Sequence, residues 1–498
     1  MLSLTVFLPL VAALALLVPR VGTRVVAWWW VGASVLEVAL VGVLWWGYES
    51  PAPGSLAYEE QVPWIPGVDS SYHVGLDGLS LPLVAMTAVV FLACAVYSLR
   101  DPDRPRTRAA LFLALEGVCL GLFAAADLLL FFVFFDLSIV AMYLIIAGWG
   151  HGDRARSALR FFLYTFLGSL ALLAGFIGLY LAADPHTFDI VELARQNPLA
   201  GTGTTGVVVL GAVLLGLAVK TPTIPFHTWL PPAHTDAPAV GSAVLAGVLL
   251  KLGTYGFVRV AMPLLPDAWR SWAWVVLVVG IVSVLWGGLV ALGQGNLKRM
   301  IAYTSVNHMG YVVLAVGAAG VVASGTAEAR SVAVTGAVTQ MVSHGLVTAA
   351  LFLLSGTFLE RGGSYEIEEY GGLAGSAPRT TVLFAVAAFA SLGLPGLSGF
   401  IAEFQIFTGS IAAVPASAVA LLGVLLISGV LLWTLQRVFT GETRGRAVGF
   451  TDVRTHEGWA IAPLLVLSLA IGLAPRPLLD VIEPAATQVV EVIDRWSG

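Results

Sequence analysis

The sequence predicts an all-α polytopic membrane protein, and three observations support that prediction. The 498 residues are 58% hydrophobic and only 11% charged, with a mean hydropathy of +0.90. Apolar runs long enough to cross a bilayer recur along the whole chain, and the basic residues gather in every second gap between them. A soluble domain averages roughly 25% charged residues, so a water-soluble fold of this composition could not cover its surface. Lipid is therefore the expected solvent.

The apolar runs give the expected number of spans, because a transmembrane helix needs ~20 apolar residues at a rise of ~1.5 Å each. We predict about 14 spans, centred near residues 10, 36, 90, 117, 138, 170, 214, 249, 281, 310, 345, 395, 425 and 466. The longest polar gap, residues 48–79, is expected as a loop outside the membrane. The first run, Leu2 to Val18, has no basic residue before it, so we expect a retained span and not a cleaved signal.

The basic residues predict the orientation. If the gap after Val18 is cytoplasmic, the cytoplasmic gaps hold seventeen Lys and Arg residues and the opposite side holds six. Basic residues are enriched in cytoplasmic loops, so this asymmetry sets the topology. We expect a multi-pass protein of the cell (plasma or inner) membrane with both termini on the outer, periplasmic or extracytoplasmic, side.

Two helices interrupted by proline and glycine suggest an internal repeat. One interruption is Lys220–Phe226 (KTPTIPF) and the other is Gly393–Phe400 (GLPGLSGF), each with a charged residue beside it. If spans four to eight and nine to thirteen form two units, both interruptions fall on the fourth span of a unit. An odd number of spans inverts the second unit, and broken helices at matching places in inverted repeats indicate an ion site near the midplane.

The expected organisation follows from these two inverted five-helix repeats, each with a discontinuous helix. We predict an N-terminal part with spans 1–3 and the outside loop, a first repeat, a second repeat, and a last part with span 14 and the tail, at residues 1–108, 109–262, 263–440 and 441–498.

Four charged residues lie inside predicted spans: Asp136, Lys220, Lys251 and Glu403. A charge at the centre of a span costs roughly 2.5–3.5 kcal/mol, so four independent charges would cost roughly 10 kcal/mol. Static ion pairs between helices are one explanation. A proton-carrying role is the other, and we favour it because the chain has 22 Arg but only three Lys, two of them within spans. Arginine stays protonated, whereas a desolvated lysine can lose its proton near neutral pH.

Further titratable residues could serve the same route. His308 and His344 lie in adjacent spans, where neutral imidazole suits a relay, although buried structural histidines are an equal alternative. Glu116 has a similar predicted depth to Asp136, so the two could share a proton or a water chain. A hydrogen bond from Glu116 to a neighbouring helix is the alternative.

His227 and His234 follow the first interruption, and their spacing of seven could place them on one helical face, although prolines intervene. We expect them to shape the cytoplasmic mouth of the route.

Cofactor chemistry finds no support in the sequence. Cys94 and Cys119 lie in apolar runs without metal-ligand spacing, and no acidic or Cys residue adjoins the two histidines after the interruption. Haem between His308 and His344 is disfavoured, because no second pair follows at a matching depth. No basic patch suggests nucleic acid. We expect no cofactor and no metal on this chain.

Four segments resemble one known family: Gly75–Ser80 (GLDGLS), Lys220–Pro238 (KTPTIPFHTWLPPAHTDAP), Asn296–Tyr311 (NLKRMIAYTSVNHMGY) and Gly393–Phe404 (GLPGLSGFIAEF). Together they are similar to the antiporter-like membrane subunits of respiratory complex I, the proton-pumping NADH–quinone oxidoreductase. In most of these relatives a lysine stands where this chain has Glu403, whereas the M-type branch (chain 4 in mitochondria) has glutamate. The chain also ends soon after span 14, without the long lateral helix of the L type. The resemblance therefore implies the M-type branch.

The resemblance also implies roles and partners. It makes Asp136 and Lys220 a pair between spans five and seven, Lys251 the central carrier, and Glu403 the terminal site, with His308 and His344 on the route. It implies L-type, N-type and small membrane subunits as neighbours together with lipids, and FMN, iron–sulfur clusters, NADH and quinone in other subunits. One departure is that the family usually has glutamate where this chain has Asp136.

Two rival functions remain at this stage. An Mrp-type cation/proton antiporter subunit shares the fold and is disfavoured by Glu403. A passive membrane scaffold would use the buried charges only as static ion pairs.

Overall fold

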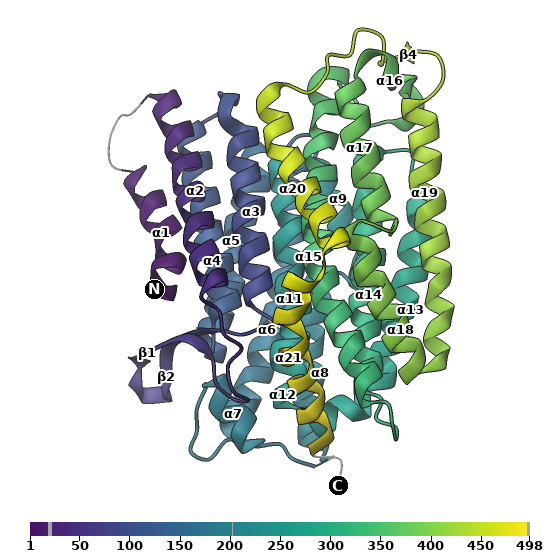
Figure 1. Ribbon diagram of the computed structural model, residues 1–498. Helices are drawn as coiled ribbons and strands as arrows, with labels where there is room; N and C mark the ends of the chain where they lie inside the picture. The colour runs from purple at the N-terminus through teal and green to yellow at the C-terminus, as the bar shows by residue number, and fades with distance from the viewer. Residues whose placement is uncertain (18–21, 202, 496–498) are drawn as a thin grey trace.

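The computed structural model describes residues 1–17, 22–201 and 203–495 as a tall bundle of helices with a small hairpin at its lower end (Figure 1). The N-terminal part contains α1 (Leu2–Ala15), α2 (Thr23–Trp46), the strands β1 (Ala57–Ile65) and β2 (Ser70–Leu76), and α3 (Leu81–Tyr97). Then follow α4 (Pro105–Ala124), α5 (Leu128–Trp149), α6 (Arg154–Ala182), α7 (Ile190–Gln196), α8 (Thr204–Lys220) and α9 (Leu230–Asp236).

The next helix is made of α10 (Ala239–Val244), α11 (Leu250–Gly256) and α12 (Met262–Leu264), joined by the π-helical segments Leu245–Leu249 and Phe257–Ala261. The second half contains α13 (Pro266–Leu292), α14 (Leu297–Gly320), α15 (Ala327–Thr357), α16 (Leu373–Ser376), α17 (Pro378–Ser391), α18 (Ser398–Ala413) and α19 (Leu421–Phe439). The short strands β3 (Tyr370–Gly371) and β4 (Arg444–Gly445) pair with each other, and α20 (Thr455–Leu473) and α21 (Arg476–Arg495) end the described chain.

The expected helical, multi-span membrane fold is confirmed. Ten helices among the described residues are long and apolar enough to cross a membrane, and α1 and α8 are shorter apolar helices. The expected break between the N-terminal part and the first repeat, after residue 108, falls inside α4, so a boundary before Pro105 fits the helix better.

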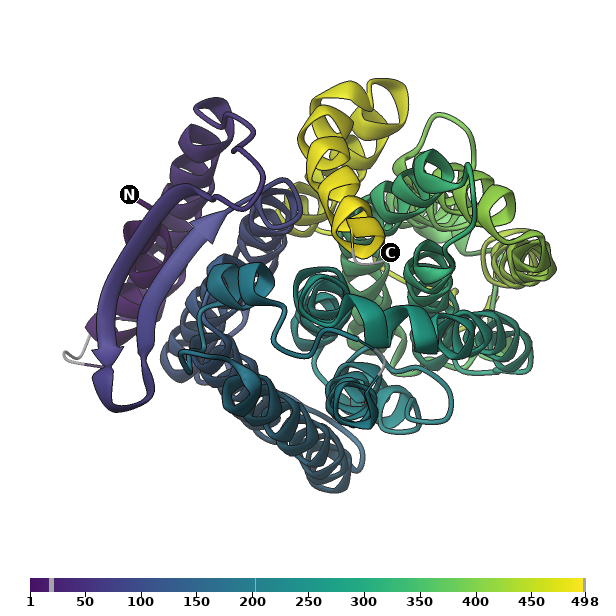
Figure 2. The ribbon, with the colours of Figure 1, turned by 90° about the horizontal axis from the view of Figure 1, so that it is seen from below.

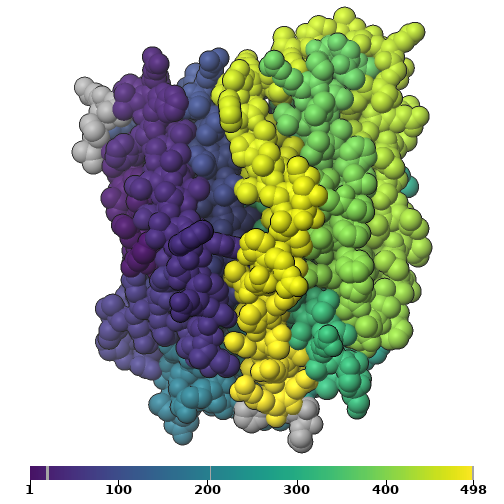
Figure 3. Space-filling view, viewed as in Figure 1, coloured from purple at the N-terminus to yellow at the C-terminus, as the bar shows by residue number. Residues whose placement is uncertain are grey.

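The bundle has an enclosed centre and a lipid-facing periphery. Within their apolar windows, 94% of the residues are buried both in the α10–α12 helix and in the helix that contains α15, against 33% in α2 and α20. Figure 3 shows α20 and α21 as one column along a face of the molecule, between the N-terminal helices and the later ones. A central helix contacts only protein, so any charge on it must find its partners within the bundle.

The β1–β2 hairpin departs from the all-α expectation. Within residues 48–79, β1 and β2 pair antiparallel, with Gln61 opposite His73, and a turn at Pro66–Val68 connects them. The strand β2 is attached to the bundle, because the Ala126 N–H donates to the carbonyl of His73 at 2.8 Å. Seen from below, the hairpin lies across the ends of the N-terminal helices (Figure 2). The Met1 amino group pairs with Glu60 of β1 at 2.7 Å, and the chain ends at this same lower end of the bundle (Figure 1).

A buried histidine ties the hairpin to the bundle. The Nδ1 atom of His73 lies 2.6 Å from Asp189, which caps α7, and its Nε2 atom lies 2.8 Å from Glu59 of β1. Asp127, the N-cap of α5, accepts hydrogen bonds from Ser70 and Ser71 nearby. The Asp127 carboxylate also accepts from the N–H groups of Leu129 and Leu130 and so caps α5 at the turn that follows α4.

We expect this attachment of the hairpin to be strongest at mildly acidic pH. Burial lowers the pKa of His73, but the hydrogen bonds and charges of Asp189 and Glu59 outweigh burial and leave the pKa raised above its usual 6.5. The folded state thus binds the proton more tightly than the unfolded chain. The stabilisation is complete below the usual pKa and is lost as pH rises through the raised value.

Amide hydrogen exchange of residues 57–76 from about pH 5.5 to about pH 8.5 measures this effect as a loss of protection. His73→Gln should remove the pH dependence, and the exposed His186→Gln should keep it. Equal protection at both ends of the pH range in the unmodified protein would contradict the prediction.

Candidate functional site

The first helix interruption lies directly after Lys220. Pro222 and Pro225 have no N–H to donate, so α8 cannot continue through them. The backbone groups freed by the break find partners inside the bundle. The Ile224 N–H donates to the Ser283 hydroxyl at 3.1 Å, and the Trp229 indole donates to the Val219 carbonyl at 3.0 Å. An irregular segment can exist at membrane depth because its freed backbone groups find partners within the protein, even though Pro225 itself is exposed.

The second interruption separates α17 from α18 and positions Glu403. Gly393 and Gly396 have φ angles of +76° and +95°, a region that favours glycine. A Cβ atom on Gly393 would lie 2.5 Å from the Glu403 carboxylate, so only glycine lets this carboxylate fold back against the break. The Ser391 carbonyl, freed at the end of α17, faces Nε2 of His308 at 3.0 Å. The break therefore supplies both a place for Glu403 and a polar partner for His308.

Four titratable side chains from four helices form a row through the centre. The Lys251 ammonium lies 2.6 Å from Nδ1 of His344, the rings of His344 and His308 lie 5.4 Å apart between centroids, and Nε2 of His308 lies 3.9 Å from Glu403. All four residues are buried, at 0–7% exposure. We call Lys251, His344, His308 and Glu403 the central row. Neighbours this close can exchange protons directly or through one water.

A small polar cavity lies beside the central row. Its volume is about 10 Å³, and it is lined by His308, His344 and Glu403 together with Gln340 and Ser343. A cavity of roughly 10–15 Å³ holds one water when polar groups line it. It is far too small for a haem, so the disfavoured haem alternative has no room here. Behind it, Ser343 shares a hydrogen bond with Ser398 at 2.7 Å, and Ser398 shares another with Ser468 at 2.7 Å.

The π-helical segment before α11 holds Lys251 in place. The ammonium donates to the Ala246 carbonyl, five residues earlier, at 2.6 Å. The carbonyl lies in the π-helical segment Leu245–Leu249, one turn before Lys251. Lys251 thus has a backbone acceptor and an imidazole within reach, and no carboxylate of the described residues pairs with it.

Lys220 and Asp136 lie within electrostatic reach of each other without direct contact. The Lys220 ammonium donates to the Ser138 hydroxyl at 3.0 Å and lies 4.8 Å from the centre of the Phe135 ring. The Asp136 carboxylate faces Ser169 and feels the charge of Lys220. Lys220 is buried, but Asp136 is only partly covered. The expected pair is therefore not in direct contact: Lys220 binds Ser138 of α5, and the half-buried Asp136 keeps an enclosed Oδ1 atom without a hydrogen-bond partner among the described residues.

Glu116 is bonded to α2, which is one of the two readings that the sequence left open. Its carboxylate accepts a hydrogen bond from Ser34 of α2 at 3.2 Å, and the charge acting on it is that of Glu37, one turn along α2. All three residues are fully buried. The contact of Glu116 is with a neighbouring helix, as in the alternative to sharing a proton with Asp136. Similar predicted depth does not determine which way a side chain points around a helix.

His227 and His234 do not share a helical face. His227 precedes α9, and its ring lies 6.3 Å from that of Tyr303. His234 is on α9, is fully buried and stacks on Phe352 at 4.4 Å between ring centroids. Both nitrogens of His234 lack hydrogen-bond partners within the described structure, and the charges of Lys298 and Lys251 act on it. His234 is therefore enclosed in the bundle, within electrostatic reach of Lys298 and Lys251.

Lys298 is the functional candidate that the sequence did not reveal. Lys298 is one of the seventeen basic residues in the predicted cytoplasmic gaps, yet its side chain is 0% exposed. The ammonium donates to the Ala237 carbonyl at 2.5 Å and lies 5.3 Å from the centre of the Tyr365 ring. The sequence did contain one indication of this role. The chain has arginine at nearly all of its basic positions, so a lysine at position 298 is unusual.

Metal binding has no candidate in residues 1–17, 22–201 and 203–495, where no three His, Cys, Asp or Glu side chains gather as ligands would. The chemistry that this arrangement offers is proton transfer between nitrogen and oxygen bases.

Comparison with known proteins identifies the family. Residues 125–429 match the family described as "NADH:quinone oxidoreductase/Mrp antiporter, TM". An "NADH-quinone oxidoreductase subunit M" of Rickettsia bellii (strain RML369-C) is 38% identical over 494 residues, which cover 96% of each chain. The chain belongs to the antiporter-like membrane subunits of NADH–quinone oxidoreductase. It falls in the M-type branch that Glu403 indicated.

Solved structures agree with this assignment to the antiporter-like subunits. A chain of "Respiratory complex I from Thermus thermophilus with bound NADH" is 31% identical, with a TM-score of 0.89, and the match covers 99% of this chain and 100% of that one. A chain of the "Mrp complex from Dietzia sp. DQ12-45-1b" has a TM-score of 0.85 at 23% identity, covering 99% of this chain and 97% of that one. At that identity the likeness shows a shared fold alone.

We expect Gly393→Ala to displace the Glu403 carboxylate of this antiporter-like subunit. A Cβ atom at this φ costs about 1–2 kcal/mol and also pushes the Glu403 carboxylate away from His308. The melting temperature and the proton pumping of the purified complex should both fall. Gly429→Ala in α19 is the matched control, because its Cβ atom would meet nothing within 4 Å. If the two variants melted and pumped alike, the close approach of Glu403 to the break would be refuted.

Proposed function

We propose that this chain is the proton-translocating, M-type antiporter-like subunit of an NADH–quinone oxidoreductase. The observation that carries the proposal is the central row, in which Lys251, His344, His308 and Glu403 from four helices lie one beside the next. An isolated charge within a span costs roughly 2.5–3.5 kcal/mol, so four titratable groups in one row call for a functional reason. This row moves protons laterally through the middle of the membrane.

Proton movement along the chain follows from electrostatic coupling. One unit charge at ~10 Å in an effective dielectric of ~20 changes a neighbour's ionisation energy by about 1.7 kcal/mol, or roughly one pKa unit. A change at Asp136 alters the field at Lys220, Lys220 biases Lys251, and Lys251 passes its proton to Nδ1 of His344. His308 then carries the proton toward Glu403. Each proton transfer needs a pKa shift of only roughly one unit.

Proton entry uses residues on the other side of Lys251. Lys298 and His234 lie buried on the same side of the bundle as the basic loops, and the charges of Lys298 and Lys251 both reach His234. Water joining these groups would supply Lys251 from the cytoplasm. His227, between the interruption and α9, is an accessory group at the junction of the two routes.

The energy for pumping comes from partner subunits. FMN, iron–sulfur clusters, NADH and quinone belong to those subunits, and the part assigned to this chain is proton transfer alone. L-type and N-type antiporter-like subunits and small membrane subunits are its neighbours, with lipid around them. The partly exposed Asp136 supports such a contact, because a neighbouring subunit at α5 would bury it and would thereby change the field at Lys220.

The finer topology belongs to the same proposal. Fourteen segments cross the membrane, and spans four to eight and nine to thirteen are inverted repeats. Both termini lie on the outer side of the cell membrane. The matching interruptions after Lys220 and after Ser391 support the repeats, and the positive charges at the opposite end from the hairpin support the orientation.

Lys251→Ala and Glu403→Gln should each reduce proton pumping per electron by about tenfold or more, because each removes a proton carrier from the row. Proton uptake by NADH-energised membrane vesicles measures this, after assembly of the complex has been verified by native gel. A passive scaffold predicts impaired assembly with normal pumping per electron in whatever complex remains. Sodium-dependent transport without NADH would favour the Mrp-type alternative.

Glu116→Gln should leave proton pumping nearly unchanged, because Glu116 faces α2 and lies off the row. The amide keeps an acceptor for Ser34 and has the same size. The same vesicle assay checks this, with Lys251→Ala as the negative control. A loss of pumping as large as that of Lys251→Ala would place Glu116 on the route after all and restore its proposed link with Asp136.

A further inference from the structure

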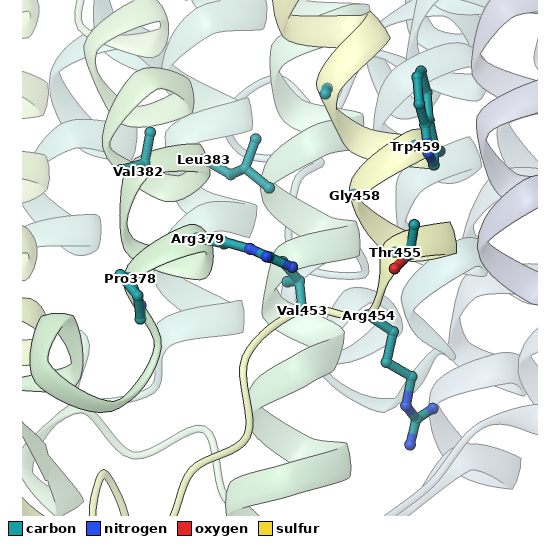
Figure 4. A pocket seen from close by; sticks show the side chains of 10 residues that line it. Pro378, Arg379, Val382, Leu383, Val453, Arg454, Thr455, Gly458 and Trp459 are labelled. Atoms are coloured by element: carbon teal, nitrogen blue, oxygen red, sulfur yellow. The ribbon is translucent and has the colours of Figure 1, made fainter.

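A groove lies between the start of α17 and the start of α20, at the end of the bundle opposite the hairpin. We define this α17–α20 groove by Arg379, Val382, Leu383, Arg454, Trp459 and Ala462, and its volume is about 570 Å³. Figure 4 shows Arg379 extending across the space between the two helices, while Arg454 points outward from the start of α20. Trp459 and Val382 line opposite sides further along.

The walls of the groove are apolar and uncovered. Trp459 is 71% exposed and Val382 is 62% exposed, which are large values for residues on the apolar helices of a bundle. The aliphatic side chains of Leu383 and Ala462 continue the same surface. An indole near the end of a membrane helix is typical of the interface between headgroups and acyl chains. A hydrocarbon chain therefore fits this surface.

The arginines at the groove keep an unneutralised positive charge. No carboxylate of the described residues lies within 4.0 Å of the Arg379 guanidinium. The nearby Asp452 is already occupied, because it accepts from the N–H of Arg379 at 2.8 Å and from both the N–H and the hydroxyl of Thr380 at 2.8 and 2.7 Å. These hydrogen bonds outweigh its burial and lower the pKa of Asp452, so it stays a carboxylate committed to the start of α17.

The second arginine has only a distant partner that it shares with another arginine. Arg454 reaches Glu457 only at 3.9 Å, and Glu457 already pairs with the buried Arg361 at 2.5 Å. The groove thus combines an apolar wall with two guanidinium groups whose nearest acids serve other partners.

We propose that the α17–α20 groove binds one anionic phospholipid, with its phosphate at Arg379 and an acyl chain along Val382, Leu383 and Trp459. A guanidinium group binds phosphate oxygens through two parallel hydrogen bonds. A zwitterionic headgroup also carries a phosphate, but its positive group reduces the net attraction to the arginine. A second apolar groove, between Met86 of α3 and Leu346 of α15, has a volume of about 390 Å³ and no charged residue in its lining. That groove accepts acyl chains without selecting a headgroup and serves as an internal comparison.

The test uses the whole detergent-purified complex, stripped of lipid and titrated with phosphatidylglycerol or phosphatidylcholine under native mass spectrometry. We expect one tightly bound phosphatidylglycerol per complex to be lost in Arg379→Gln, with about fivefold to tenfold weaker binding. Phosphatidylcholine binding should not change. Arg299→Gln is the matched control, because Arg299 is an exposed arginine at the same end of the bundle and outside the groove.

A second variant separates a built groove from general charge attraction. Val382→Trp fills the apolar wall without altering charge, and it should release the same lipid. Retention of phosphatidylglycerol in both variants, or equal losses in Arg379→Gln and Arg299→Gln, would overturn the proposal. So would a photo-crosslinker at position 382 that captures a neighbouring subunit in the intact complex and no lipid.

Discussion

The structure depends on one constraint, which is that a charge or a free backbone group inside the bilayer must find its partner within the bundle. Lys251 shows how this works. The π-helical turn before it supplies the Ala246 carbonyl, and α15 supplies His344, so the ammonium has two acceptors and no carboxylate partner among the described residues. A lysine bound by a carboxylate would be held as a static ion pair. A lysine bound by a carbonyl and an imidazole can give up its proton and take another.

The helix interruptions serve the same end. Ending α17 at Ser391 frees a carbonyl that His308 uses, and glycine at position 393 makes room for the Glu403 carboxylate. After Lys220, the freed groups bind Ser283 and Trp229 and leave the lysine directed toward α5. Irregular backbone is costly in lipid, so at both interruptions the freed backbone groups are bonded within the protein, while Pro225 and Leu394 remain exposed at the edges.

The aqueous ends follow a different rule, because water and lipid headgroups can neutralise charge there. At the lower end, acids gather around His73 and fasten the hairpin to α5 and α7. At the upper end, Asp452 and Glu457 are committed to backbone N–H groups and to Arg361, which leaves Arg379 open to an external anion. The two ends thus differ in the sign of the charge that remains available to external groups. At the upper end this charge is the positive charge of Arg379.

The sequence by itself determined the membrane fold, the two interruptions and the identity of the central residues. Hydropathy, proline and a lysine within an apolar run are local features that can be read from the sequence alone. It did not determine which side chains meet. Glu116 turned toward α2, His234 was enclosed against Phe352, Lys298 was buried, and residues 57–76 formed a hairpin. A helix can be rotated about its axis at almost no local cost, so the packing of neighbouring helices alone decided where each buried charge points.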